Sequence, residues 1–127
     1  MRIFVLFLVA AALVLSAADV NVSGKWSGTF SLTKPDGTND DGTAFAVFKQ
    51  EGGQISGTAG PDEEHQWTIQ KGAISGNNVT FEVKSDEDGT IFKCNLVVDG
   101  DHLKGPVTAF APDGQTMSAK ADFSRVK

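Results

Sequence analysis

Short runs of alternating apolar and polar residues cover most of the chain after residue 20. In one run, Val79, Phe81 and Val83 alternate with Thr80, Glu82 and Lys84. A period of two is typical of a β-strand with one buried face. Clusters of Gly, Asp, Asn and Pro separate the runs. The strands that this pattern predicts are residues 22–33, 43–50, 54–59, 66–74, 79–85, 90–98, 102–111 and 115–126.

The connections between these eight predicted strands are all short. No apolar stripe with the helical period of 3.6 residues persists in this part of the chain, so no crossover helix is available to join parallel strands. Antiparallel neighbours joined by hairpins are therefore expected, as in the Asp99-Gly100 turn. Closure of such a sheet removes its unpaired edges. We predict an all-β fold, an eight-stranded antiparallel up-and-down β-barrel.

The N-terminus has the three-part pattern of a secretory signal peptide. Arg2 supplies a positive charge, residues 3–15 are apolar, and small residues end at Ala18. An apolar run of about 13 residues is too short to span a bilayer as a helix. The alternative interpretation is a short buried helix. We expect cleavage after Ala18, which leaves residues 19–127 as a single secreted or periplasmic domain without a lipid anchor.

Composition narrows the possible partners of this predicted domain. After residue 18 the chain has 10 Lys and Arg against 16 Asp and Glu, a formal charge of −6. Such an acidic balance argues against nucleic acids and anionic membranes as partners. A single cysteine, Cys94, excludes an internal disulfide, and its place on the apolar side of a strand predicts an unreactive thiol. We expect a monomer.

One local motif carries a resemblance to a known group of proteins. Gly24-Lys25-Trp26 opens the first predicted strand, and Arg125 lies near the C-terminus on the same side of its strand as Phe123. This arrangement resembles the calycin superfamily of lipocalins, fatty-acid-binding proteins and avidins. The resemblance implies that Gly24, Trp26 and Arg125 close one end of the barrel, with the cation over the indole ring.

The resemblance covers the two ends of the chain and the number of strands, but not the middle. Lipocalins add a second motif that contains tyrosine, and this chain has no tyrosine. Avidins enclose biotin with tyrosine and several tryptophans, whereas only Trp67 could stand inside this barrel. Biotin is therefore not expected. The glycine rhythm is also similar to small secreted bacterial β-domains of unassigned function, which bring no residues with known roles.

Metal binding and catalysis find little support in the sequence. His65 follows three acids, 62–64, but adjacent loop residues cannot all point at one ion. The loop that begins at Asp36 lacks the glycine and glutamate that a calcium-binding helix-loop-helix requires. His65 and His102 have no serine or cysteine nucleophile in a recognisable frame. We predict no enzyme activity, no metal and no cofactor.

Two functions remain open. The first is a binding module for a small apolar ligand inside the barrel. Its predicted site residues are Phe30, Trp67, Phe81, Phe92 and Met117. Inward-facing glycine and alanine either leave room for a ligand or let a narrow barrel taper shut.

The second function is that of an interaction or inhibitor protein with a protein partner. Acidic loops at 36–41, 62–64 and 86–88 indicate a surface that complements a basic partner.

Overall fold

A computed structural model describes residues 20–127. The predicted signal peptide, residues 1–18, lies outside the described residues. The described strands are β1 (Gly24–Thr33), β2 (Asn39–Glu51), β3 (Gln54–Asp62), β4 (His65–Thr68), β5 (Gln70–Ser75), β6 (Asn78–Lys84), β7 (Ile91–Asp99), β8 (His102–Phe110) and β9 (Thr116–Arg125). Within this part of the chain no helix is long and apolar enough to cross a membrane.

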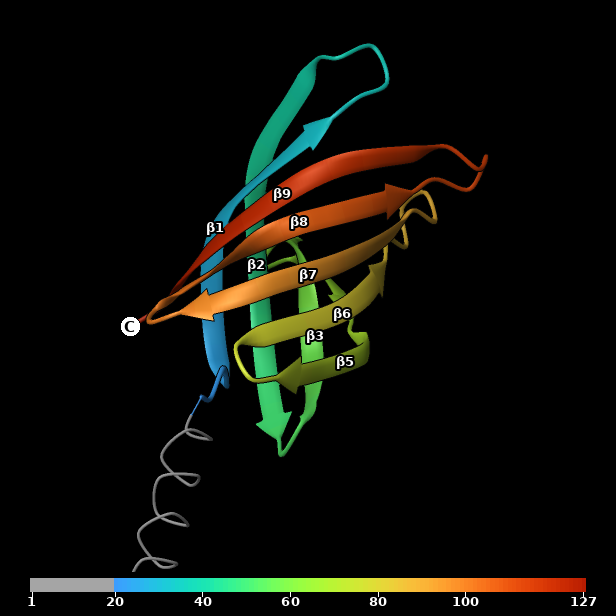
Figure 1. The fold of residues 1–127 in the computed structure, drawn as a ribbon. Coiled ribbons are helices and arrows are strands. Elements are labelled where there is room, and N and C mark those ends of the chain that lie inside the picture. The colour runs from blue at the N-terminus through green and yellow to red at the C-terminus, as the bar shows by residue number, and fades with distance from the viewer. Residues whose placement is uncertain (1–19) are drawn as a thin grey trace, which may run out of the picture.

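The strands form one closed antiparallel sheet (Figure 1). Consecutive strands pair with each other except β4 and β5, and β1 pairs with β9 through registers such as Trp26 with Arg125. The order β2-β1-β9-β8-β7-β6-β5-β3 is completed by pairing of β2 with β3. This arrangement confirms the predicted closed, eight-stranded antiparallel barrel. β4 and β5 together occupy the position of one barrel strand, because both pair with β3.

The predicted continuous strand at 66–74 is divided at Ile69, which is a correction to the sequence analysis. Ile69 is buried, and its N–H donates to the Gly57 carbonyl at 2.9 Å. Lys71 then adopts a positive φ of 54°, and the register with β6 shifts between Gln70 and Ala73. The shift is a β-bulge, which bends a strand and increases its local twist. The break at Ile69 thus divides the segment into β4 and β5, and the bulge lies within β5 directly after the break.

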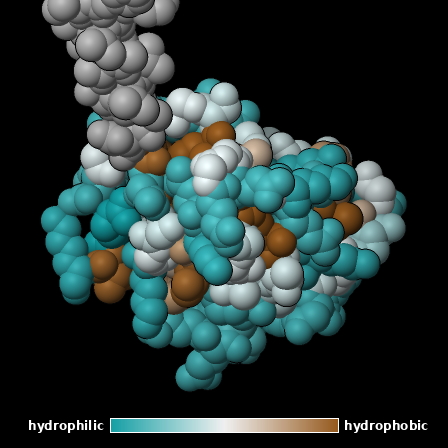
Figure 2. Space-filling view, turned by 90° about the horizontal axis from the view of Figure 1, so that it is seen from below, coloured by the Kyte–Doolittle hydropathy of each residue, from teal (hydrophilic) through white to brown (hydrophobic). Residues whose placement is uncertain are grey.

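Alternating side chains of every barrel strand fill the interior. The fully buried side chains Trp26, Leu96 and Leu103 belong to the runs whose alternation predicted an inward face. The face of the molecule in Figure 2 is mostly hydrophilic, with separate small hydrophobic areas. Burial of the apolar set is the main favourable contribution to folding here, at about 25 cal/mol per Å² of apolar area removed from water.

Glycine and alanine have different roles inside the barrel. Gly57 has a φ of 125°, and a side chain there would collide with the Val47 carbonyl of the paired strand. Glycine thus permits the close backbone approach that a small barrel needs. Ala44, Ala59 and Ala121 instead border an open pocket. Gly57 therefore serves close backbone approach, whereas the three alanines leave space inside the barrel.

Candidate functional site

Trp26 and Arg125 are in contact at the end of the barrel where β1 begins and β9 ends. Trp26 is completely buried, and its Nε1–H donates to the Val22 carbonyl at 2.9 Å. The Arg125 guanidinium carbon lies 4.4 Å from the centroid of the Trp26 ring. A cation at this distance from an indole face is attracted by the ring quadrupole. The structure thus brings together the two residues that the sequence resemblance paired.

Arg125 also fastens the segment that leads into β1. Its Nη1 donates to the Ser23 carbonyl at 3.0 Å, and its Nη2 to the Asn21 carbonyl at 2.9 Å. Gly24, the third predicted closure residue, has a φ of 126°, a conformation that favours glycine. Asp101 lies 3.4 Å from Arg125 Nε. Lys127 first, and Arg125 second, hold the pKa of Asp101 below its ordinary value.

An apolar pocket of about 110 Å³ lies toward the opposite end of the barrel. Its lining residues are Phe30, Thr43, Ala44, Ala59, Gly60, Pro61, Trp67, Phe81, Val83, Phe92, Cys94, Val107, Ala121 and Phe123. None of these carries a formal charge at neutral pH. Phe30, Trp67 and Phe92 are only half-buried, which shows that the pocket reaches the surface.

Aromatic rings form one side of this pocket. The Trp67 and Phe92 rings are parallel within 1°, with centroids 6.1 Å apart. Phe30 meets Phe92 edge to face at 5.8 Å. Together with Phe81, these are four of the five predicted ligand-contacting residues. The fifth, Met117, is half-buried near the start of β9 and does not line the pocket.

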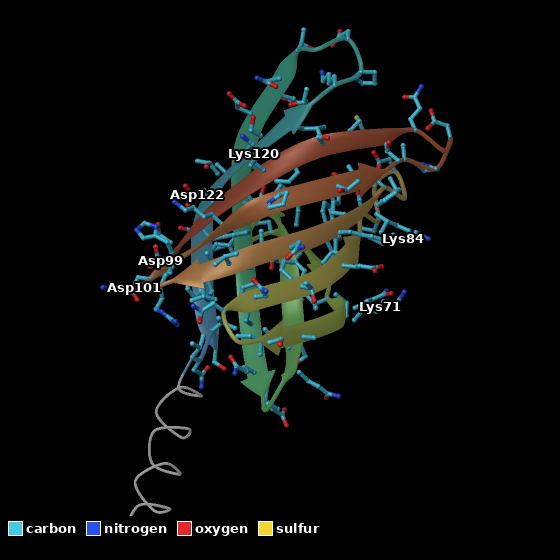
Figure 3. All side chains as sticks on the ribbon, viewed as in Figure 1. Lys71, Lys84, Asp99, Asp101, Lys120 and Asp122 are labelled. Carbon is cyan, nitrogen blue, oxygen red and sulfur yellow. The ribbon has the colours of Figure 1, made fainter. Side chains whose placement is uncertain are left out.

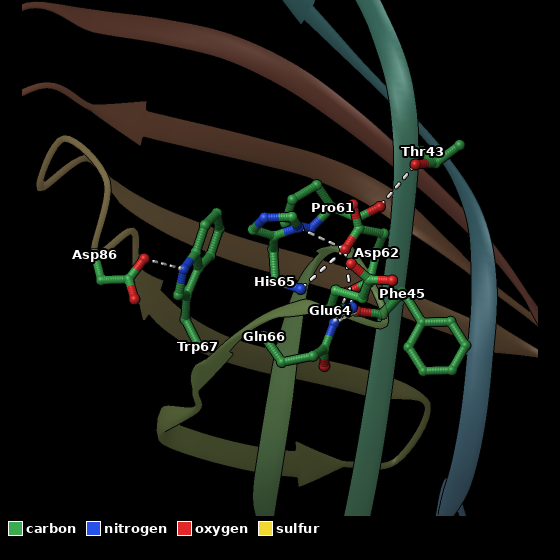
Figure 4. A network of polar contacts seen from close by, with 9 residues as sticks. All are labelled: Thr43, Phe45, Pro61, Asp62, Glu64, His65, Gln66, Trp67 and Asp86. Carbon is green, nitrogen blue, oxygen red and sulfur yellow. Dashed lines mark hydrogen bonds and ion pairs between the residues drawn. The ribbon is translucent and has the colours of Figure 1, made fainter.

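A polar network holds the rim of the pocket on the β3–β4 side (Figure 4). Trp67 Nε1–H donates to Asp86 Oδ1 at 2.9 Å, which ties β4 to the loop before β7. The Gln66 amide donates to the Asp62 carbonyl at 2.8 Å and to the Phe45 carbonyl at 2.9 Å. These bonds fix the position of Trp67 although its side chain is only half-buried.

His65 and Asp62 form an exposed pair at the same rim. Asp62 Oδ1 lies 2.8 Å from His65 Nδ1 and also accepts the His65 backbone N–H at 2.9 Å. The hydrogen bond from the His65 side chain lowers the pKa of Asp62, and the same contact raises the pKa of His65. Among residues 20–127, no group of three or more His, Cys, Asp or Glu side chains is placed to hold a metal ion.

Several pocket residues were not among the predicted ligand contacts. Cys94 is one, and burial raises the pKa of its thiol to about 12. Cys94 lies two residues after Phe92 in the same strand, so the alternation of the strand could have placed both side chains on the pocket side. Thr43 and Pro61 were not identifiable in this way. They come together across β2 and β3, where the Thr43 hydroxyl donates to the Pro61 carbonyl at 2.7 Å.

Comparisons with known proteins leave the chain without an assigned family. No protein-family model matches it, and no curated protein matches it. Among solved structures, it is similar to a protein of unknown function from the DUF3598 family of Nostoc punctiforme. The TM-score is 0.49 at 14% identity, over 83% of this chain and 48% of the other, so this chain spans about half of that protein's length. Membership of the calycin superfamily is not shown by these comparisons.

Proposed function

We propose that this chain is an exported, monomeric, non-catalytic binding protein that holds a small apolar group inside its barrel. The apolar pocket carries this proposal. It reaches the surface at one end, no charged side chain lines it, and its aromatic rings are fixed by packing and by the Trp67–Asp86 hydrogen bond. Small-molecule sites are commonly preformed, concave and mainly apolar, and barrel mouths are a frequent location for them.

The pocket volume limits the size of the bound group. An engineered apolar cavity of about 150 Å³ holds benzene. A pocket of about 110 Å³ therefore suits a short branched alkyl group or, with small side-chain adjustments, one aromatic ring. Ala44, Ala59 and Ala121 set this size, because a larger side chain at any of them would project into the space. The rest of a larger ligand would lie outside, at the rim.

Recognition of a protein partner has less support. Stable interfaces have an apolar centre surrounded by polar groups. In the described part of the chain, the exposed large hydrophobic residues are Val97 and Val126. Val97 lies near the end of β7 and Val126 follows β9, so both are remote from the acidic loops that suggested such a partner. The pocket therefore supports a small ligand better than the loops support a protein.

Toluene, which is neutral and contains one ring, is a suitable probe for the full chain. We expect saturable chemical-shift changes for Phe92 and Ala121 in a nuclear magnetic resonance titration. Ala121→Leu fills the pocket and should abolish these changes. Ala73→Leu on the exposed side of β5 is the matched control and should keep them. Changes that persist in Ala121→Leu would contradict binding in this pocket.

Export is tested separately by expression of the full chain in a bacterial host and fractionation of the cells. We expect the protein outside the cytoplasm, with Asp19 as its first residue. Replacement of Leu6 and Leu8 by Arg interrupts the apolar run and should retain the uncleaved chain in the cytoplasm. An exported fraction that is unchanged by these substitutions would contradict a signal peptide.

A further inference from the structure

The charges of the described residues are distributed unevenly between the two ends of the barrel. We define the mouth loops as residues 34–42, 62–65, 84–90 and 111–115, which comprise the connections at the pocket end and the strand residues next to them. Their carboxylates are Asp36, Asp40, Asp41, Asp62, Glu63, Glu64, Asp86, Glu87, Asp88 and Asp113.

Only two lysines, Lys34 and Lys84, accompany these ten carboxylates, so the mouth loops have a formal charge of −8 with His65 neutral. The remaining residues from 20 to 127 hold five carboxylates against eight Lys and Arg, a formal charge of +3. The pocket therefore lies at the strongly negative end of the barrel.

Two of the mouth loops are joined directly to the pocket lining. Pro61 lines the pocket, and Asp62 follows it in the chain. Trp67 lines the pocket and donates its indole N–H to Asp86 (Figure 4). The segments 62–64 and 86–88, which hold six carboxylates, thus adjoin two lining residues, Pro61 and Trp67. When His65 is protonated, its contact with Asp62 offsets one of these charges.

We propose that the bound molecule is a small organic cation, such as an amine attached to one ring or a short alkyl group. This inference rests on the proposed function. The apolar part enters the pocket, and the ammonium group stays at the rim beside the carboxylates. A buried charge without a partner would be strongly unfavourable, and the pocket lining offers no charged partner. Charge complementarity at the rim therefore selects the class of ligand.

The same charges disfavour anionic ligands. In water, one carboxylate about 4 Å from an ammonium group contributes roughly a fivefold change in Kd, and a carboxylate on the ligand would be repelled by a similar factor. Salt weakens these effects because the Debye length falls from about 30 Å at 0.01 M to about 10 Å at 0.1 M ionic strength. A fatty acid or other carboxylate is thus the wrong class of ligand for this mouth.

Three probes of nearly equal shape test the inference on the full chain. They are 3-phenylpropylamine, 3-phenylpropanol and 3-phenylpropionate, measured by isothermal titration calorimetry at low and at high salt. We expect the amine to bind about tenfold more tightly than the alcohol at low salt, and the carboxylate more weakly than either. The differences should shrink at high salt. Binding of the alcohol reports the pocket alone.

Two triple variants with the same change in net charge test which carboxylates cause the preference for the amine. The first, Glu63→Gln with Glu64→Gln and Glu87→Gln, removes carboxylates from the rim but keeps Asp86, which holds Trp67. The second changes Glu51→Gln, Asp99→Asn and Asp122→Asn, away from the mouth loops. Asp99 and Asp122 lie at a distance from Lys84 in Figure 3. We expect the preference for the amine to fall several-fold in the first variant and to persist in the second.

Each other result has a definite consequence. If none of the three probes binds, both the proposed function and this inference are wrong. If the alcohol binds but the amine and the carboxylate bind equally well, the pocket is a ligand site and only the inference is wrong. An equal loss of preference in both triple variants would show that the net charge of the protein causes it, which also overturns the inference.

Discussion

At one end of the barrel Trp26 is fully buried beneath the Arg125 guanidinium, whereas at the other end Trp67 is half-buried beside an open pocket. Both indole N–H groups are hydrogen-bonded, but to different kinds of partner. Trp26 donates to the backbone carbonyl of Val22, and Trp67 donates to the carboxylate of Asp86. The first arrangement holds the segment before β1 against the end of β9, and the second positions an aromatic side chain at a surface opening.

This difference indicates how a small barrel combines stability with an accessible interior. At the closed end, the guanidinium joins Asn21 and Ser23 to β9 and lies over the Trp26 ring. At the open end, hydrogen bonds at the rim hold Trp67 while alanine side chains leave space next to it. Changes at the two ends should therefore have different consequences for stability and for binding.

The largest expected effect is the loss of stability in Trp26→Ala. Removal of a fully buried tryptophan costs about 3 to 5 kcal/mol, a large part of the total stability of a domain. Trp67→Ala should cost only about 1 to 2 kcal/mol, because that ring is half-buried. Urea unfolding followed by circular dichroism measures both. Equal costs would contradict the distinction between a fastening end and a binding end.

Cys94 gives a kinetic measure of the pocket end. At pH 8 a thiol with a pKa of about 12 has roughly 1,000-fold less thiolate than one at the ordinary value of 9.0. Modification by iodoacetamide should therefore be about 1,000-fold slower in the folded protein than in urea. Toluene should slow it further if the ligand shares the pocket. Rapid modification of the folded protein would show that Cys94 is not buried as described.

Arg125→Met tests the cation at the closed end while it keeps much of the side-chain volume. The change removes the contact with Trp26 and two hydrogen bonds to backbone carbonyls, so we expect a loss of about 2 kcal/mol. Lys127→Met is the control, because Lys127 forms only an exposed ion pair with Asp101 and should matter little. The alcohol probe should bind both variants as it binds the natural chain under conditions where they are folded.

The smallest effect concerns the His65–Asp62 pair at the pocket rim. The raised pKa of His65 gives a contribution to stability that is complete below 6.5 and disappears as the pH rises through the raised value. The lowered pKa of Asp62 gives a contribution that is present above 3.8 and is lost as the pH falls through the lowered value. The pair therefore stabilises most between these two ordinary values.

Nuclear magnetic resonance titration of His65 measures this pair directly. Asp62→Asn should lower the pKa of His65 toward 6.5, because it removes the main cause of the shift. Glu63→Gln is the matched control, since Glu63 is not among the causes of that shift. A similar change in both variants would mean that the general negative charge of the rim, rather than the hydrogen bond, raises the pKa of His65.

The amino-acid sequence by itself determined the class of fold and the closed end. A period of two and short turns are local properties, and they limited the chain to antiparallel neighbours. The resemblance to calycins paired Trp26 with Arg125, and the shared parity of Arg125 and Phe123 placed Arg125 on the inward side of its strand. The order of a closed meander then makes the first and last strands neighbours.

The tertiary structure alone decided the volume of the pocket and which acidic segments adjoin it. Alternation shows that Phe30, Phe81 and Phe92 face inward, but the empty volume is what remains after side chains from opposite strands have packed. The break at Ile69 depends on that packing, and so does the meeting of Thr43 with Pro61. Such contacts join residues that are far apart in the chain, and their distances follow from closure of the whole barrel rather than from any local pattern.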